Sequence, residues 1–80
     1  MQIGHAGRKA STARPWDGAG SLAPDSAEGW QVIGPSALPF ADWQMPVAMD
    51  RDEIGRVLND FASAARRAFE AGFRLLELHA

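Results

Sequence analysis

Residues 50–80, DRDEIGRVLNDFASAARRAFEAGFRLLELHA, contain the strongest structural signal in the chain. Asp50 is a good helix N-cap, and Glu53, three residues later, completes the pair of a capping box. Gly72 supplies a left-handed stop immediately after the last helical turn. Together these signals predict an α-helix over residues 51–71.

Apolar side chains of the predicted helix fall on one side when they are projected at about 100° per residue. This face comprises Ile54, Val57, Leu58, Phe61, Ala62, Ala64, Ala65, Ala68 and Phe69. The opposite face is charged or polar. Such a separation predicts a surface helix with one face packed on a sheet or on other helices.

Residues 73–80, FRLLELHA, follow the glycine and are too few for a second helix. Their largely apolar character is typical of a strand covered on both faces. Glu77 and His79 share strand parity and therefore face the same side, where a buried carboxylate would need a partner. Two interpretations stay open for this pair, a satisfied core pair and a functional site.

The amino-terminal residues 1–9, MQIGHAGRK, predict another strand segment, whose extended part ends at Gly7. A strand, a crossover with a helix and a second strand form a βαβ unit, so the predicted fold class is α/β. His5-Ala6-Gly7-Arg8-Lys9 could also bind an anion, because glycine lets the backbone approach a phosphate. A strand end with solvated charges is the simpler interpretation.

Residues 10–49 form a long predicted loop that holds all five prolines and all three tryptophans. Loops of this length in compact domains are commonly lids or binding walls. Val32-Ile33 predicts a short strand within it. Trp16, Trp30 and Trp43 are expected to anchor the loop, with stacking on a planar ligand as the alternative.

Two other chemical signals are weak. Gly18-Ala19-Gly20-Ser21-Leu22-Ala23 has the spacing of a dinucleotide-binding fingerprint, but no strand is predicted before it and Pro24 follows where a helix should continue. His5 and His79 are the two histidines, and their wide separation in sequence predicts no metal site.

The bulk composition excludes several classes of protein. A net charge of −2 predicts neither a nucleic acid nor a membrane surface as a partner. The absence of cysteine excludes disulfides and thiolate zinc sites. No apolar run has the length of a membrane span, so we expect a cytoplasmic protein with a small-molecule substrate.

Three stretches of the sequence resemble the old yellow enzyme family, especially its bacterial xenobiotic-reductase-like branch. The first is Gln2-Ile3-Gly4-His5-Ala6-Gly7-Arg8-Lys9-Ala10-Ser11, running into Arg14-Pro15-Trp16. The second, Gly34-Pro35-Ser36-Ala37, is similar to the A-P-S-A segment of the family, with glycine in place of the first alanine. The third runs from Phe61 through Ala64-Ala65-Arg66-Arg67-Ala68 and Ala71-Gly72-Phe73 to Glu77-Leu78-His79-Ala80.

This resemblance implies a (β/α)8 TIM barrel that holds FMN at the carboxyl ends of its strands. Residues 1–80 would supply part of that barrel: strand 3 (1–9), a long loop on the active-site side (10–49), helix 3 (51–71) and strand 4 (73–80). The activity implied is that of an NAD(P)H-dependent ene-reductase, which reduces FMN with NADH or NADPH and then reduces an activated alkene or a related electron-poor xenobiotic.

The resemblance also implies two site residues. Gln2 matches the family position whose amide hydrogen-bonds the polar edge of the flavin, where it can donate and accept. His79 matches the first member of the H-x-x-H or H-x-x-N pair, which donates to the substrate oxygen. Gln2 is therefore the expected cofactor-binding residue, and His79 the expected catalytic and substrate-binding residue.

The second member of the pair, the proton-donating tyrosine and the phosphate-binding loops of the family have no counterpart in residues 1–80. We therefore expect a fragment without activity of its own, from a parent that is a homo-oligomer like its relatives. The alternative is a non-catalytic remnant or an interaction fragment that binds no flavin.

Overall fold

The computed structural model describes residues 1–79 and divides them into two units. The strand–helix unit comprises residues 1–5 and those from Asp50 onward, and the loop unit comprises Ala6–Met49. The strand–helix unit contains strand β1 (Gln2–Gly4), helix α1 (Arg51–Glu70) and strand β4 (Glu77–His79). The loop unit contains the 3-10 turns η1 (Gly7–Lys9) and η2 (Pro15–Asp17) and strands β2 (Ile33–Gly34) and β3 (Val47–Ala48).

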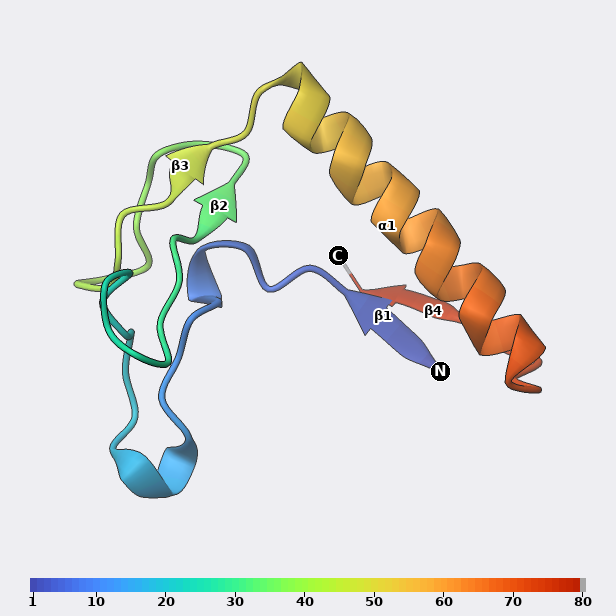
Figure 1. Ribbon diagram of the computed structural model, residues 1–80, viewed down its shortest axis with the longest axis horizontal. Coiled ribbons are helices and arrows are strands. Elements are labelled where there is room, and N and C mark those ends of the chain that lie inside the picture. The colour runs from blue at the N-terminus through green and yellow to red at the C-terminus, as the bar shows by residue number, and fades with distance from the viewer. Residues whose placement is uncertain (80) are drawn as a thin grey trace. The chain divides into compact units, whose positions relative to one another are not determined.

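The two strands of the strand–helix unit pair in parallel, side by side in Figure 1, although they lie near opposite ends of the chain. Parallel neighbours need a crossover connection, and α1 lies in that connection. The predicted strand–crossover–helix–strand order and the α/β class are therefore confirmed. The complete barrel lies beyond what these elements show.

Helix α1 begins and ends where its capping residues predict. The Asp50 side chain accepts a hydrogen bond from the backbone N–H of Glu53, and the Glu53 side chain accepts one from the backbone N–H of Asp50, which completes the capping box. At the other end Gly72 has a φ of 93°. Its N–H donates to the carbonyl of Phe69, and that of Phe73 donates to the carbonyl of Ala68. These two bonds form a Schellman motif, which satisfies carbonyls at the helix end.

Replacing Asp50 by alanine is expected to destabilise α1 by about 1 kcal/mol, because the Glu53 N–H loses its acceptor. Urea unfolding followed by helical circular dichroism measures the change. Asp60→Ala, on the solvated face, is the matched control and should change the midpoint by less than half as much. Equal midpoints for Asp50→Ala and the wild type would show that the cap does not stabilise the helix.

The apolar face of α1 packs only in part. Ala68 is buried, and Met1, Ile3, Ala64, Arg67, Ala68 and Ala71 line a shallow hollow between α1 and β1. Ile54, Leu58 and Phe69 are 45%, 64% and 57% exposed. The prediction of a helix packed along its apolar face is thus correct for Ala64, Ala65 and Ala68 and wrong for this stripe of large residues, which no element of the strand–helix unit covers.

Both predicted strands are longer than those observed. The segment expected as strand 1–9 ends as a strand at Gly4, because Gly7 takes a φ of 55° and starts the turn η1. The strand expected over 73–80 begins only at Glu77, since parallel pairing with β1 starts there; Ala80 lies outside the described residues. Burial on both faces is wrong as well, because all three residues of β4 are exposed.

The region predicted as a loop over 10–49 contains its own small sheet. Strands β2 and β3 pair in parallel, Ile33 with Val47 and Gly34 with Ala48. The predicted strand at Val32-Ile33 is therefore present, shifted by one residue. Val32 itself is 1% exposed and forms the centre of the unit together with the buried Pro46 and Ser11.

Hydrogen bonds from Gln44 hold the loop unit together. Its Oε1 accepts from the backbone N–H of Val32 at 2.8 Å, and its Nε2 donates to the carbonyls of Leu22 and Trp30, each at 3.0 Å. The backbone N–H of Gln44 donates to the Ser21 hydroxyl. One side chain therefore joins three separate stretches of a segment that has few buried apolar groups.

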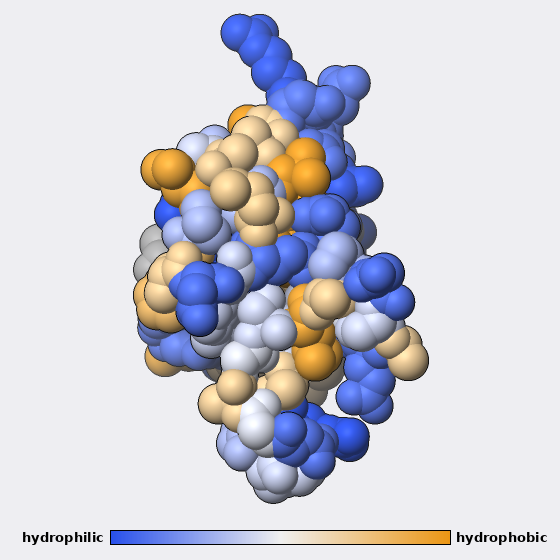
Figure 2. Space-filling model, turned by 90° about the vertical axis from the view of Figure 1, so that its left-hand side faces the viewer, coloured by the Kyte–Doolittle hydropathy of each residue, from blue (hydrophilic) through white to orange (hydrophobic). Residues whose placement is uncertain are grey.

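The three tryptophans differ in their packing. Trp43 meets the Phe40 ring edge-on with centroids 5.3 Å apart, and so serves as the predicted anchor. Trp16 is 77% exposed, which shows that the anchoring prediction is wrong for this residue. Figure 2 shows hydrophobic residues among hydrophilic ones on the face in view. No helix among residues 1–79 is long and apolar enough to cross a membrane.

Candidate functional site

The parallel register places the two predicted site residues on adjacent strands. Gln2 pairs with Glu77, and Gly4 pairs with His79. In a parallel pair, side chains of partnered residues point to the same face, and successive residues alternate between faces. Gln2, Glu77 and His79 therefore share one face of the strand pair.

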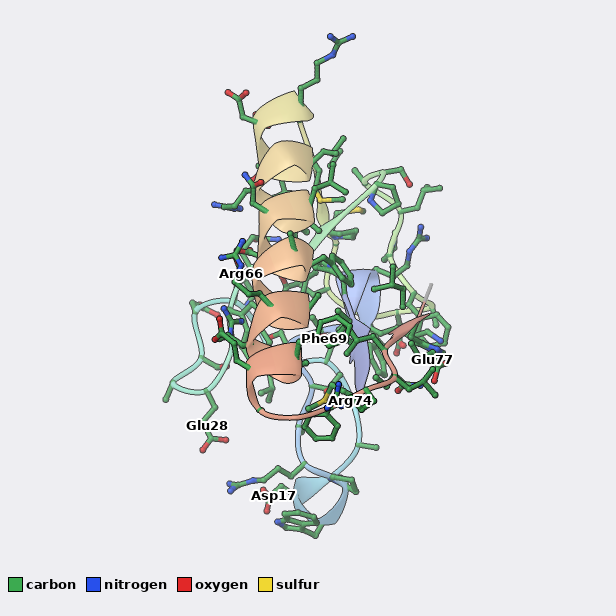
Figure 3. The ribbon with its side chains drawn as sticks, turned by 90° about the vertical axis from the view of Figure 1, so that its right-hand side faces the viewer. Asp17, Glu28, Arg66, Phe69, Arg74 and Glu77 are labelled. Atoms are coloured by element: carbon green, nitrogen blue, oxygen red, sulfur yellow. The ribbon has the colours of Figure 1, made fainter. Side chains whose placement is uncertain are left out.

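That face is the one turned away from α1. Met1 and Ile3 line the hollow beneath the helix, so that Gln2 and Gly4, with the opposite parity, belong to the other side. Figure 3 shows Glu77 beyond the strands, on the side opposite α1. Helix packing thus leaves the polar face of β1 and β4 free for a ligand.

Glu77 lies beside His79 on this polar face. The Glu77 Oε1 is 3.7 Å from the His79 Nδ1, and the two side chains are 61% and 65% exposed. The expected common facing of the pair is therefore observed. The expected burial of the carboxylate is wrong, because no element of the strand–helix unit covers this side of the strands.

Gly4 allows β1 to approach His79 closely. A Cβ at this position would lie 3.3 Å from the backbone oxygen of His79 and 3.4 Å from its Cβ. Contacts this close would push β4 or its side chain away. Gly4 is not among the site residues predicted from the sequence, and only its pairing with His79 identifies it.

The donor set fits one edge of a flavin and the oxygen of a substrate. Strand β1 ends at Gly4, which pairs with His79, so the imidazole lies beside the carboxyl end of β1; (β/α)8 enzymes carry their sites at such strand ends. The amide of Gln2 can donate and accept at once, as the alternating donors and acceptors of a flavin edge require.

The other candidate residues belong to different surroundings. The Lys9 ammonium lies 4.2 Å from the centroid of the Phe40 ring, so a cation–π contact engages the charge that an anion site would use. Gly18 and Gly20 have φ values of 90° and 143°, and neither a strand before them nor a helix after them makes a dinucleotide site. Among residues 1–79 no three His, Cys, Asp or Glu side chains cluster to hold a metal ion.

The strand–helix unit is a parallel βαβ unit that carries an amide and an imidazole on one face, which defines an α/β chain. Its relatives are flavin and nicotinamide enzymes. Over the whole chain it is 39% identical to a NADH:flavin oxidoreductase of Gibberella zeae. It is 37% identical to NADPH dehydrogenases of Listeria monocytogenes and Bacillus velezensis, again over the whole chain.

The chain spans about a fifth of the length of these relatives, 20% of the first and 19% of the other two. No family model matches it. The names of these relatives support one part of the predicted resemblance, namely that to an NADH- or NADPH-linked flavin oxidoreductase.

Proposed function

We propose that these residues are the third-strand to fourth-strand segment of a (β/α)8 barrel in an FMN-dependent NAD(P)H oxidoreductase. The observation that carries the proposal is the register, which brings Gln2 and His79 together on the face away from α1. The sequence similarity over the whole chain to proteins named NADH:flavin oxidoreductase and NADPH dehydrogenase also supports it. So do the uncovered β4 and the exposed stripe of α1, which are surfaces that further strands and helices of a barrel would cover.

Gln2 would hold the flavin and His79 the substrate. When bound, FMN supplies the hydride, which it receives from NADH or NADPH. The Gln2 amide orients the polar edge of the ring by hydrogen bonds. His79 donates from its imidazole to the oxygen of an activated alkene or a related electron-poor compound, and so stabilises the negative charge that develops there during hydride transfer.

Flavin binding is expected in a chimera in which residues 1–80 replace the matching 81 residues of the Bacillus velezensis NADPH dehydrogenase. Gln2→Leu in that chimera should weaken flavin binding about 10-fold, because an amide that makes one or two hydrogen bonds contributes roughly 1.4 kcal/mol. Titration of the apo-chimera with FMN measures the affinity.

A chimera carrying the corresponding Listeria monocytogenes segment serves as the matched control. If that control binds flavin and the chimera with residues 1–80 does not, the proposed function is wrong. If both bind and Gln2→Leu has the affinity of its parent, the role of Gln2 alone is wrong.

A non-catalytic interaction fragment is the second candidate function. The exposed large apolar side chains of the strand–helix unit favour it, because such surfaces mark interaction sites. It predicts that the same chimera fails to bind flavin.

A further inference from the structure

The turn Phe40–Trp43, near the end of the loop unit, has an unfavourable backbone. The N–H of Trp43 donates to the carbonyl of Phe40 at 2.9 Å, which closes the turn. Ala41, its first central residue, has a φ of 51°, in the left-handed region that favours glycine. A residue with a Cβ stays in this region only where the surrounding contacts support it.

Lys9 contacts this turn from the other end of the loop unit. It belongs to η1, and its ammonium lies 4.2 Å from the centroid of the Phe40 ring, which is the geometry of a cation–π contact. The Trp43 ring meets the same Phe40 ring edge-on, so the two aromatic residues at the ends of the turn are joined to each other as well. The Lys9–Phe40 contact therefore connects the first turn of the unit to its last part.

This contact depends on a charge that solvent can reach. Lys9 is exposed, and Phe40 is 40% exposed. Among residues 1–79 the Lys9 ammonium forms no ion pair, so the ring is its electrostatic partner. The hydrogen bonds of Gln44, which join other stretches of the unit, do not involve this charge.

We propose that Lys9 is a latch residue, whose ammonium holds the strained turn Phe40–Trp43 closed and whose neutralisation opens the turn. The Gln44 hydrogen bonds keep the rest of the loop unit folded when the latch opens. Acylation of the exposed Nζ atom, which removes the charge, is expected to open the turn as a neutral substitution does. The latch lies within the loop unit and is independent of flavin binding.

Hydrogen exchange at the Trp43 amide, followed by NMR of the 80-residue chain, measures how often the turn opens. Lys9→Gln is expected to speed this exchange about 2- to 5-fold, the scale of an exposed cation–π contact. Lys9→Arg retains the cation and should stay near the wild type. Arg8→Gln neutralises the neighbouring cation of η1 and is the matched control, which should leave the exchange unchanged. The Val32 amide, bonded to Gln44, should exchange equally in all these variants, because only the turn opens.

A double-mutant cycle tests whether the effect of Lys9 acts through the Phe40 ring. Phe40→Leu removes the ring, so adding Lys9→Gln to it should cause no further change in the exchange of the Trp43 amide. Ala41→Gly relieves the backbone strain and should slow the exchange about 5-fold. Where the 80-residue chain shows no protected Trp43 amide, the same amides are read in the apo-chimera.

Four results would each overturn the proposal. They are equal exchange in the wild type and Lys9→Gln, an equal effect of Lys9→Gln with and without the Phe40 ring, unchanged exchange in Ala41→Gly, and a Trp43 amide without protection in both the 80-residue chain and the apo-chimera. Because the apo-chimera contains no flavin, a failure of the latch and a failure of the proposed function are read from separate measurements.

Discussion

Replacing His79 by alanine in the flavin-loaded chimera is expected to lower kcat/KM for an activated alkene about 100-fold. Removing one donor to a developing oxyanion typically has an effect of this size or larger. The register places His79 next to Gly4, where β1 ends. Stopped-flow oxidation of the reduced chimera by the alkene measures the change.

Two variants separate the loss of a donor from a loss of structure. His79→Gln retains an N–H donor on a side chain of similar reach, and should recover part of the rate. Arg66→Ala, on the side of α1 away from the strands in Figure 3, should react like the parent chimera. An unchanged kcat/KM in His79→Ala would refute the assignment of this residue to the substrate.

Replacing Gln44 by leucine is expected to destabilise the loop unit by about 3 kcal/mol. The variant loses three side-chain hydrogen bonds and leaves the N–H of Val32, a residue 1% exposed, without its acceptor. A unit of a few dozen residues has a stability of only a few kcal/mol, so most of the cooperative transition should disappear.

The tryptophans make this measurement specific to one unit. Trp16, Trp30 and Trp43 all lie in the loop unit, so tryptophan fluorescence in urea follows that unit, while helical circular dichroism follows α1. Gln31→Leu is the matched control, because the Gln31 amide only donates, to the carbonyls of Val32 and Met45, from an exposed position. If Gln44→Leu and Gln31→Leu shift the urea midpoint of the tryptophan fluorescence equally, the hydrogen bonds of Gln44 do not stabilise the loop unit more than those of Gln31.

Local sequence signals were sufficient to predict where α1 begins and ends. Asp50, Glu53 and Gly72 act on backbone groups within one turn of themselves, and each makes the bonds that its residue type predicts. Helix bounds from the sequence therefore agree with the structure to within one residue. The Glu77–His79 pair was recognised for a similar reason, because strand parity is local.

The lengths of the strands and the burial of their side chains could not be predicted from local sequence signals. A strand extends only as far as a partner chain accepts its hydrogen bonds, and the partner of β1 comes from the far end of the sequence. Gln44 was missed because an amide between a tryptophan and a methionine gives no sign that two distant backbone segments, at Leu22 and at residues 30–32, will surround it.

By itself the sequence determined the capped helix, the βαβ order, and, through resemblance, Gln2 and His79 as the residues to examine. Only the tertiary structure decided that both stand on one face, that Gly4 approaches His79 closely, and that the Oε1 atom of Glu77 lies 3.7 Å from the Nδ1 atom of His79. The physical reason is the separation of the interacting residues along the chain. Helix caps and hydrophobic periodicity depend on residues a few positions apart, whereas the candidate site forms where parallel pairing joins two segments that the whole loop unit separates in sequence.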